Sequence, residues 1–105
     1  MKITSTELEE KIKSGEKFIV DMYAEWCGPC RILGPIVEKV SNQLKEDGHE
    51  VSIYKFNIEE DKDMAMKLGV RSIPALKGFN GGENTINKIG LISETQLMEM
   101  VKSVL

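Results

Sequence analysis

The chain has 105 residues, of which 41% are hydrophobic and 30% charged, and its formal net charge is −3. These values predict one globular domain over 1–105, large enough to bury a core without disulfide or metal staples. They exclude a transmembrane protein, because no apolar run approaches the roughly 18 residues of a membrane span. They disfavour nucleic acid as a partner, because that polyanion attracts basic surfaces. The N-terminal residues lack the apolar segment of a signal peptide, so we expect a cytoplasmic protein.

The periodicity of apolar residues predicts helices and strands that alternate along the chain. The expected elements are a helix over 5–14, a strand over 17–23, a helix over 28–47, a strand over 51–58, a short helix over 61–68, strands over 73–79 and 84–89, and a last helix after Ser93. The segment 80–83 (NGGE) between the last two strands indicates a hairpin. This order predicts an α/β fold with a central mixed β-sheet between two layers of helices, ending in a β-hairpin and a helix.

Local signals mark where the helices begin and bend. Thr6 and Glu9 have the spacing of a capping box for the first helix, and Ser93 and Gln96 have it for the last. Pro35 lies inside the long helix and lacks the backbone N–H that the helix needs, so we expect a kink there.

The two cysteines carry the most specific chemical signal. They occur in the segment 26–30 (WCGPC), between the end of a predicted strand and the start of a predicted helix. A helix N-terminus presents free N–H groups and the positive end of the helix dipole, both of which stabilise a thiolate. Cys27 is therefore expected to be the nucleophile. Cys30, one turn further on, is placed to be the resolving thiol.

Other interpretations of the cysteine pair are a structural disulfide, part of a metal site and an incidental pair. A disulfide across so short a loop would stabilise the fold by only roughly 2 kcal/mol. Zinc would need two more ligands, and His49 is the only histidine of the chain. Redox chemistry is the favoured interpretation, with no metal and no cofactor beyond the Cys27–Cys30 disulfide itself.

Asp21 is unusual because it is a carboxylate in the middle of an apolar strand. Burying it costs several kcal/mol unless it is neutral or paired. It is either an edge residue that faces water or a buried group with a raised pKa, which would suit acid–base chemistry. Lys55 also interrupts an apolar strand and could be its partner.

The chain resembles the thioredoxin family nearly from end to end. The resemblance rests on the segments 20–30 (VDMYAEWCGPC), Pro35, 55–58 (KFNI), 69–74 (GVRSIP), 82–83 (GE) and Gly90. A lone CxxC beside a βαβ pattern is a weak signal, whereas six such segments in this order are a strong one.

The resemblance implies roles for residues whose pattern alone is ambiguous. Asp21 would lie behind the cysteines and help to deprotonate Cys30, with Lys55 as a candidate partner. Pro74 would be a cis-proline that packs against the cysteine pair, and the backbone before it would pair with the substrate as an added strand. The docking surface implied by the resemblance comprises Trp26, Gly28, Pro29, Ile73 and Gly90.

The implied activity is that of a protein-disulfide reductase and electron carrier. Its partners would be proteins that carry disulfides and a separate thioredoxin reductase, because this chain has no dinucleotide-binding glycine fingerprint. We expect a monomer that binds neither nucleic acid nor membranes. One alternative is a binding or scaffold subunit in which the thiols are secondary. Another is a disulfide-forming oxidase, which the Gly28–Pro29 pair disfavours.

Four features depart from the family pattern. Lys77 and Gly78 interrupt a strand that is usually apolar, which suggests altered packing or a bulge. The returning strand of the hairpin is unusually polar. Leu91 adds bulk beside the docking surface, and Tyr23 stands where a second tryptophan is common. These departures concern stability and the choice of partner rather than the cysteine chemistry.

Overall fold

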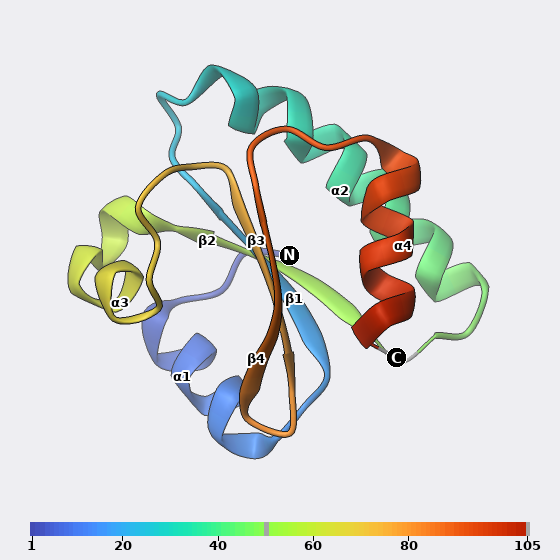
Figure 1. Ribbon diagram of the computed structural model, residues 1–105, viewed down its shortest axis with the longest axis horizontal. Helices are drawn as coiled ribbons and strands as arrows, with labels where there is room; N and C mark the ends of the chain where they lie inside the picture. Colours follow the sequence, from blue (N-terminus) through green and yellow to red (C-terminus); the bar gives the residue numbers. More distant parts are fainter. Residues whose placement is uncertain (50, 105) are drawn as a thin grey trace.

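The computed structural model describes residues 1–49 and 51–104, so the predicted domain 1–105 includes two positions outside the described part. Figure 1 shows a central sheet with helices on both sides. In chain order the elements are α1 (Ser5–Ser14), β1 (Phe18–Tyr23), α2 (Gly28–Glu46), β2 (Ser52–Asn57), the short 3-10 helix η1 (Ile58–Glu60), α3 (Lys62–Lys67), β3 (Ala75–Asn80), β4 (Glu83–Ile89) and α4 (Glu94–Val104).

The four strands form one mixed sheet in the order β2-β1-β3-β4. β1 pairs with β2 in parallel and with β3 in antiparallel orientation, and β3 pairs with β4 in antiparallel orientation. β1 thus lies between two strands, and all six of its residues are buried because other elements cover both faces of the sheet. The predicted α/β class with a mixed sheet between helices is confirmed.

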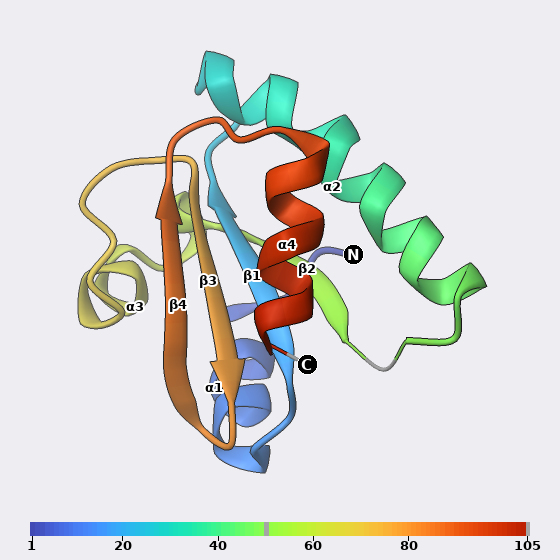
Figure 2. The same cartoon turned by 45° about the vertical axis from the view of Figure 1, so that its right-hand side comes forward.

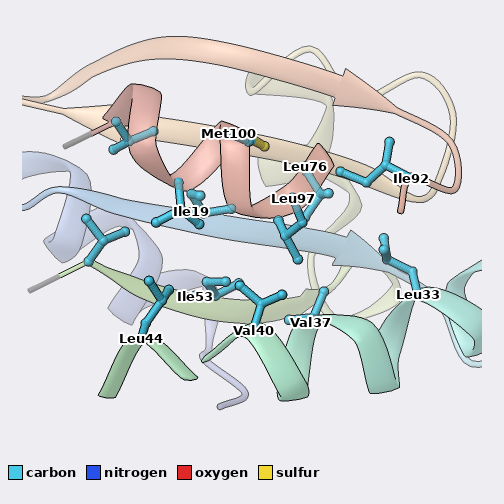
Figure 3. Close-up of a cluster of buried hydrophobic side chains, with 13 residues drawn as sticks. Ile19, Leu33, Val37, Val40, Leu44, Ile53, Leu76, Ile92, Leu97 and Met100 are labelled. Atoms are coloured by element: carbon cyan, nitrogen blue, oxygen red, sulfur yellow. The ribbon is translucent and has the colours of Figure 1, made fainter. Parts of the chain in front are cut away.

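Each face of the sheet has its own hydrophobic core. On one face, which Figure 2 shows covered by α2 and α4, Ile19 of β1 and Leu76 of β3 pack against buried side chains of these two helices (Figure 3). On the other face, Phe18, Val20 and Met22 of β1 pack with residues of α1 and of the region around α3. Since alternate residues of a strand point to opposite faces, Asp21 lies on the same face as Ile19, toward α2.

The capping box predicted for the first helix is wrong by two residues. Thr4 caps α1: its hydroxyl accepts a hydrogen bond from the Glu7 N–H (3.2 Å), and the Glu7 carboxylate accepts one from the Thr4 N–H (2.9 Å). With Thr4 as the cap, Ile3 directly precedes the cap and Leu8 lies in the first turn of the helix. Both side chains are buried in the same hydrophobic cluster. That apolar contact is available only when the helix begins after Thr4. The box predicted at Ser93 and Gln96 is confirmed for α4.

The hairpin and the irregularity near Gly78 are confirmed. Gly81 and Gly82 form a two-residue turn in which both residues have positive φ (64° and 86°), which glycine adopts without strain. The register of β3 and β4 shifts between Gly78 and Phe79, which leaves Thr85 as the extra residue of β4.

Candidate active site

The two cysteines lie at the N-terminus of α2, directly after the loop that follows β1. Cys27 and Cys30 form a disulfide with a Cα–Cα distance of 5.2 Å. Cys27 is the N-cap residue of α2, and its sulfur accepts a hydrogen bond from the Cys30 N–H at 3.2 Å. The backbone donor that contacts this sulfur can stabilise a thiolate on Cys27 once the disulfide is reduced.

The two cysteines are about equally buried, whereas the residues next to them in the sequence are exposed. Cys27 and Cys30 are both 5% exposed, in a cluster with Tyr23 and Ala24. In the oxidised protein, both cysteines are thus shielded from solvent to the same degree. Around them, Trp26, Gly28 and Pro29 are exposed. The disulfide therefore lies just under a surface made by the residues predicted to dock substrate.

Asp21 is fully buried, which excludes its interpretation as an edge residue. Neither oxygen of its carboxylate has a hydrogen-bond partner among the described residues. Loss of hydration raises the pKa of Asp21 from 3.8 to about 6, and the positive charge of Lys55 offsets part of that effect. The group can therefore gain or lose a proton near neutral pH.

Lys55 lies beside Asp21 on the neighbouring strand, because the two residues are register partners in the parallel β1–β2 pair. Its ammonium lies 4.6 Å from the centre of the Tyr23 ring, a cation–π contact. Its backbone is bonded to the N-terminal segment, since its N–H donates to the Met1 carbonyl (2.8 Å) and its carbonyl accepts from the Ile3 N–H (2.9 Å). The predicted pairing with Asp21 is thus an electrostatic interaction between adjacent strands.

Ile73, Pro74 and Gly90 come together at the end of the sheet where β3 begins and β4 ends. The Ile73–Pro74 peptide bond is cis, as the resemblance implies. The Gly90 N–H donates to the Pro74 carbonyl at 2.8 Å, which joins the two segments. Ile73 is half-buried against the cysteine cluster. It precedes the paired residues of β3, so its own peptide groups lie outside the sheet's ladder.

One polar contact of this surface is not predictable from the sequence pattern. The Trp26 indole N–H donates to the Glu59 carboxylate at 2.6 Å, and Glu59 also forms an ion pair with Lys62 at 3.4 Å. These interactions hold the pKa of Glu59 below its usual value. Trp26 is 67% exposed, so this bond orients a ring that packing leaves largely free. The partners are 33 residues apart, and no local motif indicates the contact.

A groove of about 650 Å³ runs behind the cysteines, between α2, β2 and the N-terminal residues. Its walls include Cys30, Gly34 and Lys55. Cys30 and Lys55, whose positive charge lowers the pKa of Asp21, therefore line the same groove, and none of the residues predicted to dock substrate is among its lining residues.

Within 1–49 and 51–104, no cluster of three or more histidine, cysteine or acidic side chains is arranged to hold a metal ion. His49 is exposed in the turn after α2, and the structure does not bring it to the cysteines. In the same part of the chain, no helix has both the length and the apolar character needed to cross a membrane.

Comparison with known proteins agrees with this geometry. The thioredoxin family model matches residues 1–103. A thioredoxin of Rickettsia bellii is 40% identical over 95 residues, which cover 90% of this chain and 88% of the relative. A thioredoxin of Buchnera aphidicola is 38% identical over 102 residues (96% and 92%).

Solved structures of similar fold are thioredoxins as well. Chloroplastic thioredoxin z superimposes with a TM-score of 0.84 at 28% identity, covering 98% of this chain and 91% of the other. A thioredoxin variant from Halobacterium salinarum gives a TM-score of 0.83 at 30% identity, covering 98% and 89%.

Proposed function

The chain belongs to the thioredoxin family, and from this premise we propose how its residues divide the work of disulfide reduction. It is a protein-disulfide reductase that acts by dithiol–disulfide exchange, with its own cysteines as the redox group. The observation that carries the proposal is the position of the Cys27–Cys30 disulfide at the N-terminus of α2.

In the reduced protein, the Cys27 thiolate attacks one sulfur of a substrate disulfide. The substrate S–S bond breaks, its other sulfur leaves as a thiolate that takes up a proton, and a mixed disulfide joins Cys27 to the substrate. Cys30 then attacks the Cys27 sulfur. The mixed disulfide breaks, the second substrate sulfur leaves, and the Cys27–Cys30 disulfide forms, so that two electrons and two protons have passed to the substrate.

Asp21 is the group that accepts the Cys30 proton in the second step. A base works best when its pKa lies near the working pH, and burial raises the pKa of Asp21 to about 6. Lys55 favours the charged form of Asp21 and so limits that rise. Below a pH of about 6 Asp21 is mostly protonated, so the release of substrate from the mixed disulfide is expected to slow.

The substrate docks on Trp26, Gly28, Pro29, Ile73 and Gly90. Four of these five are exposed or half-exposed apolar or small residues around the disulfide, and the indole of the fifth, Trp26, is oriented by Glu59. The peptide groups of Ile73 lie outside the ladder of β3, so they are available to an extended substrate backbone. Pro74 is buried beneath this surface and positions Ile73.

The substrates are proteins that carry disulfides, and a separate reductase returns the two electrons. We propose that this donor is a thioredoxin reductase, and that the chain works as a cytoplasmic monomer of one domain with roles in electron transport and redox homeostasis. The 105 residues of the chain contain no dinucleotide-binding glycine fingerprint, which supports a donor that is a separate protein.

The test is the reduction of insulin, whose chains are linked by disulfides, with dithiothreitol as the electron donor. Wild-type protein is expected to accelerate precipitation of the freed chains well beyond dithiothreitol alone, while Cys27→Ser and Cys30→Ser are inactive. Cys30→Ser should also accumulate the mixed disulfide, because it can make the first attack but not the second. A folded wild-type protein no faster than dithiothreitol would overturn the proposal and favour the scaffold alternative.

A further inference from the structure

A second cavity, of about 260 Å³, lies beside the docking surface on the side of the sheet that faces away from α2. It is enclosed by the loop 69–72 and by residues 75–77 and 87–89 of the two hairpin strands. We call it the basic cavity, for the charges described below.

The basic cavity is continuous with the docking surface through the backbone. Ser72, Ala75 and Ile89 line it. Ser72 directly precedes Ile73, Ala75 directly follows Pro74, and Ile89 directly precedes Gly90. A peptide seated on these docking residues therefore has the cavity next to it.

Among the described residues, the charged ones that line the basic cavity are all positive. Arg71, Lys77 and Lys88 contribute three cationic side chains, and no described aspartate or glutamate lines the cavity. This is a local excess of positive charge on a chain whose formal net charge is −3. An anion would be attracted here more than elsewhere on the protein.

Lys77 is the best evidence that the cavity suits an anion. The residue is only 8% exposed, although it carries an ammonium group. Its Nζ donates to the Asn87 side-chain oxygen at 2.8 Å, a neutral partner that uses one of its three N–H groups. Loss of hydration lowers its pKa. A buried cation with a single neutral partner gains more from a carboxylate than an exposed lysine does.

We propose that the basic cavity binds an acidic side chain of the substrate protein, so that the reductase prefers disulfides with aspartate or glutamate close to the attacked cysteine. This inference rests on the proposed function, because it assumes a substrate strand paired with Ile73. An extended peptide advances about 3.3 Å per residue. We therefore expect the acidic residue one to three positions from the cysteine.

The test compares peptide disulfides that differ in one side chain. Each peptide carries one cysteine, linked to a reporter thiol, and either glutamate or glutamine at one position from −3 to +3. For at least one position, kcat/KM with glutamate should exceed that with glutamine about tenfold, as one charge-assisted hydrogen bond in a shielded site can provide. Lys77→Met should reduce this ratio to about one and leave the glutamine peptides unaffected.

Two further variants sharpen the result. Lys77→Gln removes the charge while keeping a polar group, so it should also lose the preference even if Met perturbs the strand. Lys102→Met makes the same charge change on the exposed last turn of α4, outside the basic cavity, and should keep the preference. Higher salt should lower the glutamate-to-glutamine ratio of kcat/KM for the wild type. It should not lower this ratio for the two Lys77 variants.

The outcomes separate this inference from the function on which it rests. If the glutamine peptides are reduced but glutamate gives no advantage at any position, the basic cavity is not an acidic subsite. A preference that survives in both Lys77 variants overturns the inference equally. If no peptide is reduced faster than by dithiothreitol, the proposed function itself fails.

Discussion

Replacing Asp21 with asparagine is expected to stabilise the oxidised protein at neutral pH. The carboxylate is fully buried, and neither oxygen has a hydrogen-bond partner among the described residues. Burial raises its pKa from 3.8 to about 6, although the charge of Lys55 pulls it down. Asparagine has nearly the same shape and no charge, so the variant removes the cost of ionisation and leaves the packing of β1 in place.

The size of the effect follows from the two pKa values. A group that binds its proton more tightly when folded destabilises the fold once it ionises, at 1.36 kcal/mol per pKa unit. Because the pKa of Asp21 rises from 3.8 to about 6, this cost is about 3 kcal/mol. The cost is complete above the folded pKa of about 6 and disappears below 3.8. The unfolding free energy of the wild type should therefore rise as the pH falls from about 6 to 3.8. Asp21→Asn has no carboxylate at this position, so its unfolding free energy should not show this rise.

Guanidinium unfolding, followed by circular dichroism, measures the effect directly. At pH 7.5 the variant should be more stable than wild type by up to about 3 kcal/mol, equivalent to a melting temperature higher by roughly 10 °C or more. At pH 3.5 the two should converge. Glu38→Gln removes a charge from an exposed position of α2 and should show neither effect. The reasoning is refuted if the difference in unfolding free energy between Asp21→Asn and wild type is no larger at pH 7.5 than at pH 3.5.

Three other substitutions test the fold and the docking surface. Thr4→Ala removes the cap of α1 and should cost about 1 kcal/mol of unfolding free energy, whereas Thr6→Ala, inside the helix, should cost much less. Gly78→Ala would place a methyl group 2.5 and 2.8 Å from β-branched side chains of β4 and α4, and should destabilise the protein by about 1–3 kcal/mol in guanidinium unfolding. Glu59→Ala frees the indole of Trp26 and should raise KM for insulin about threefold with little change in kcat, as the loss of one exposed hydrogen bond implies.

Each of these predictions would be contradicted by a specific outcome. Equal losses for the two threonine variants would mean that the helix begins elsewhere. An unchanged stability for Gly78→Ala would show that the side chains around it can move aside at no cost. A fall in kcat for Glu59→Ala, with KM unchanged, would place this residue in the chemical step; Glu60→Ala, an exposed neighbour, serves as its control.

The sequence predicted most of the fold because the apolar pattern has one consistent solution. The strand 18–23 has only one polar residue, Asp21, and six buried positions, so it could only be a central strand. The start of α1 was less certain, because both Thr4–Glu7 and Thr6–Glu9 match the capping pattern. Tertiary packing of Ile3 against the core decides between them, and no local rule contains that information.

For the site, the sequence identified residues whose chemistry conflicts with their surroundings. Asp21 and Lys55 each interrupt an apolar strand, and the parallel register makes them neighbours. Contacts between distant segments were out of reach: the bond from Trp26 to Glu59 depends on where η1 ends up, not on either local pattern. Lys77 was noted only as a defect of its strand, because its role depends on a cavity that three separate segments enclose.

The polar character of β4 has a consequence for how the protein behaves at high concentration. β4 lies at the end of the sheet, with one side unpaired by any other strand of the order β2-β1-β3-β4. Six of its seven residues are exposed, and the register shift at Thr85 interrupts its regularity. An irregular and hydrophilic edge strand is a poor template for a strand of another molecule. The polar residues of β4, which weaken the packing of the hairpin, therefore also disfavour edge-to-edge aggregation of the sheet.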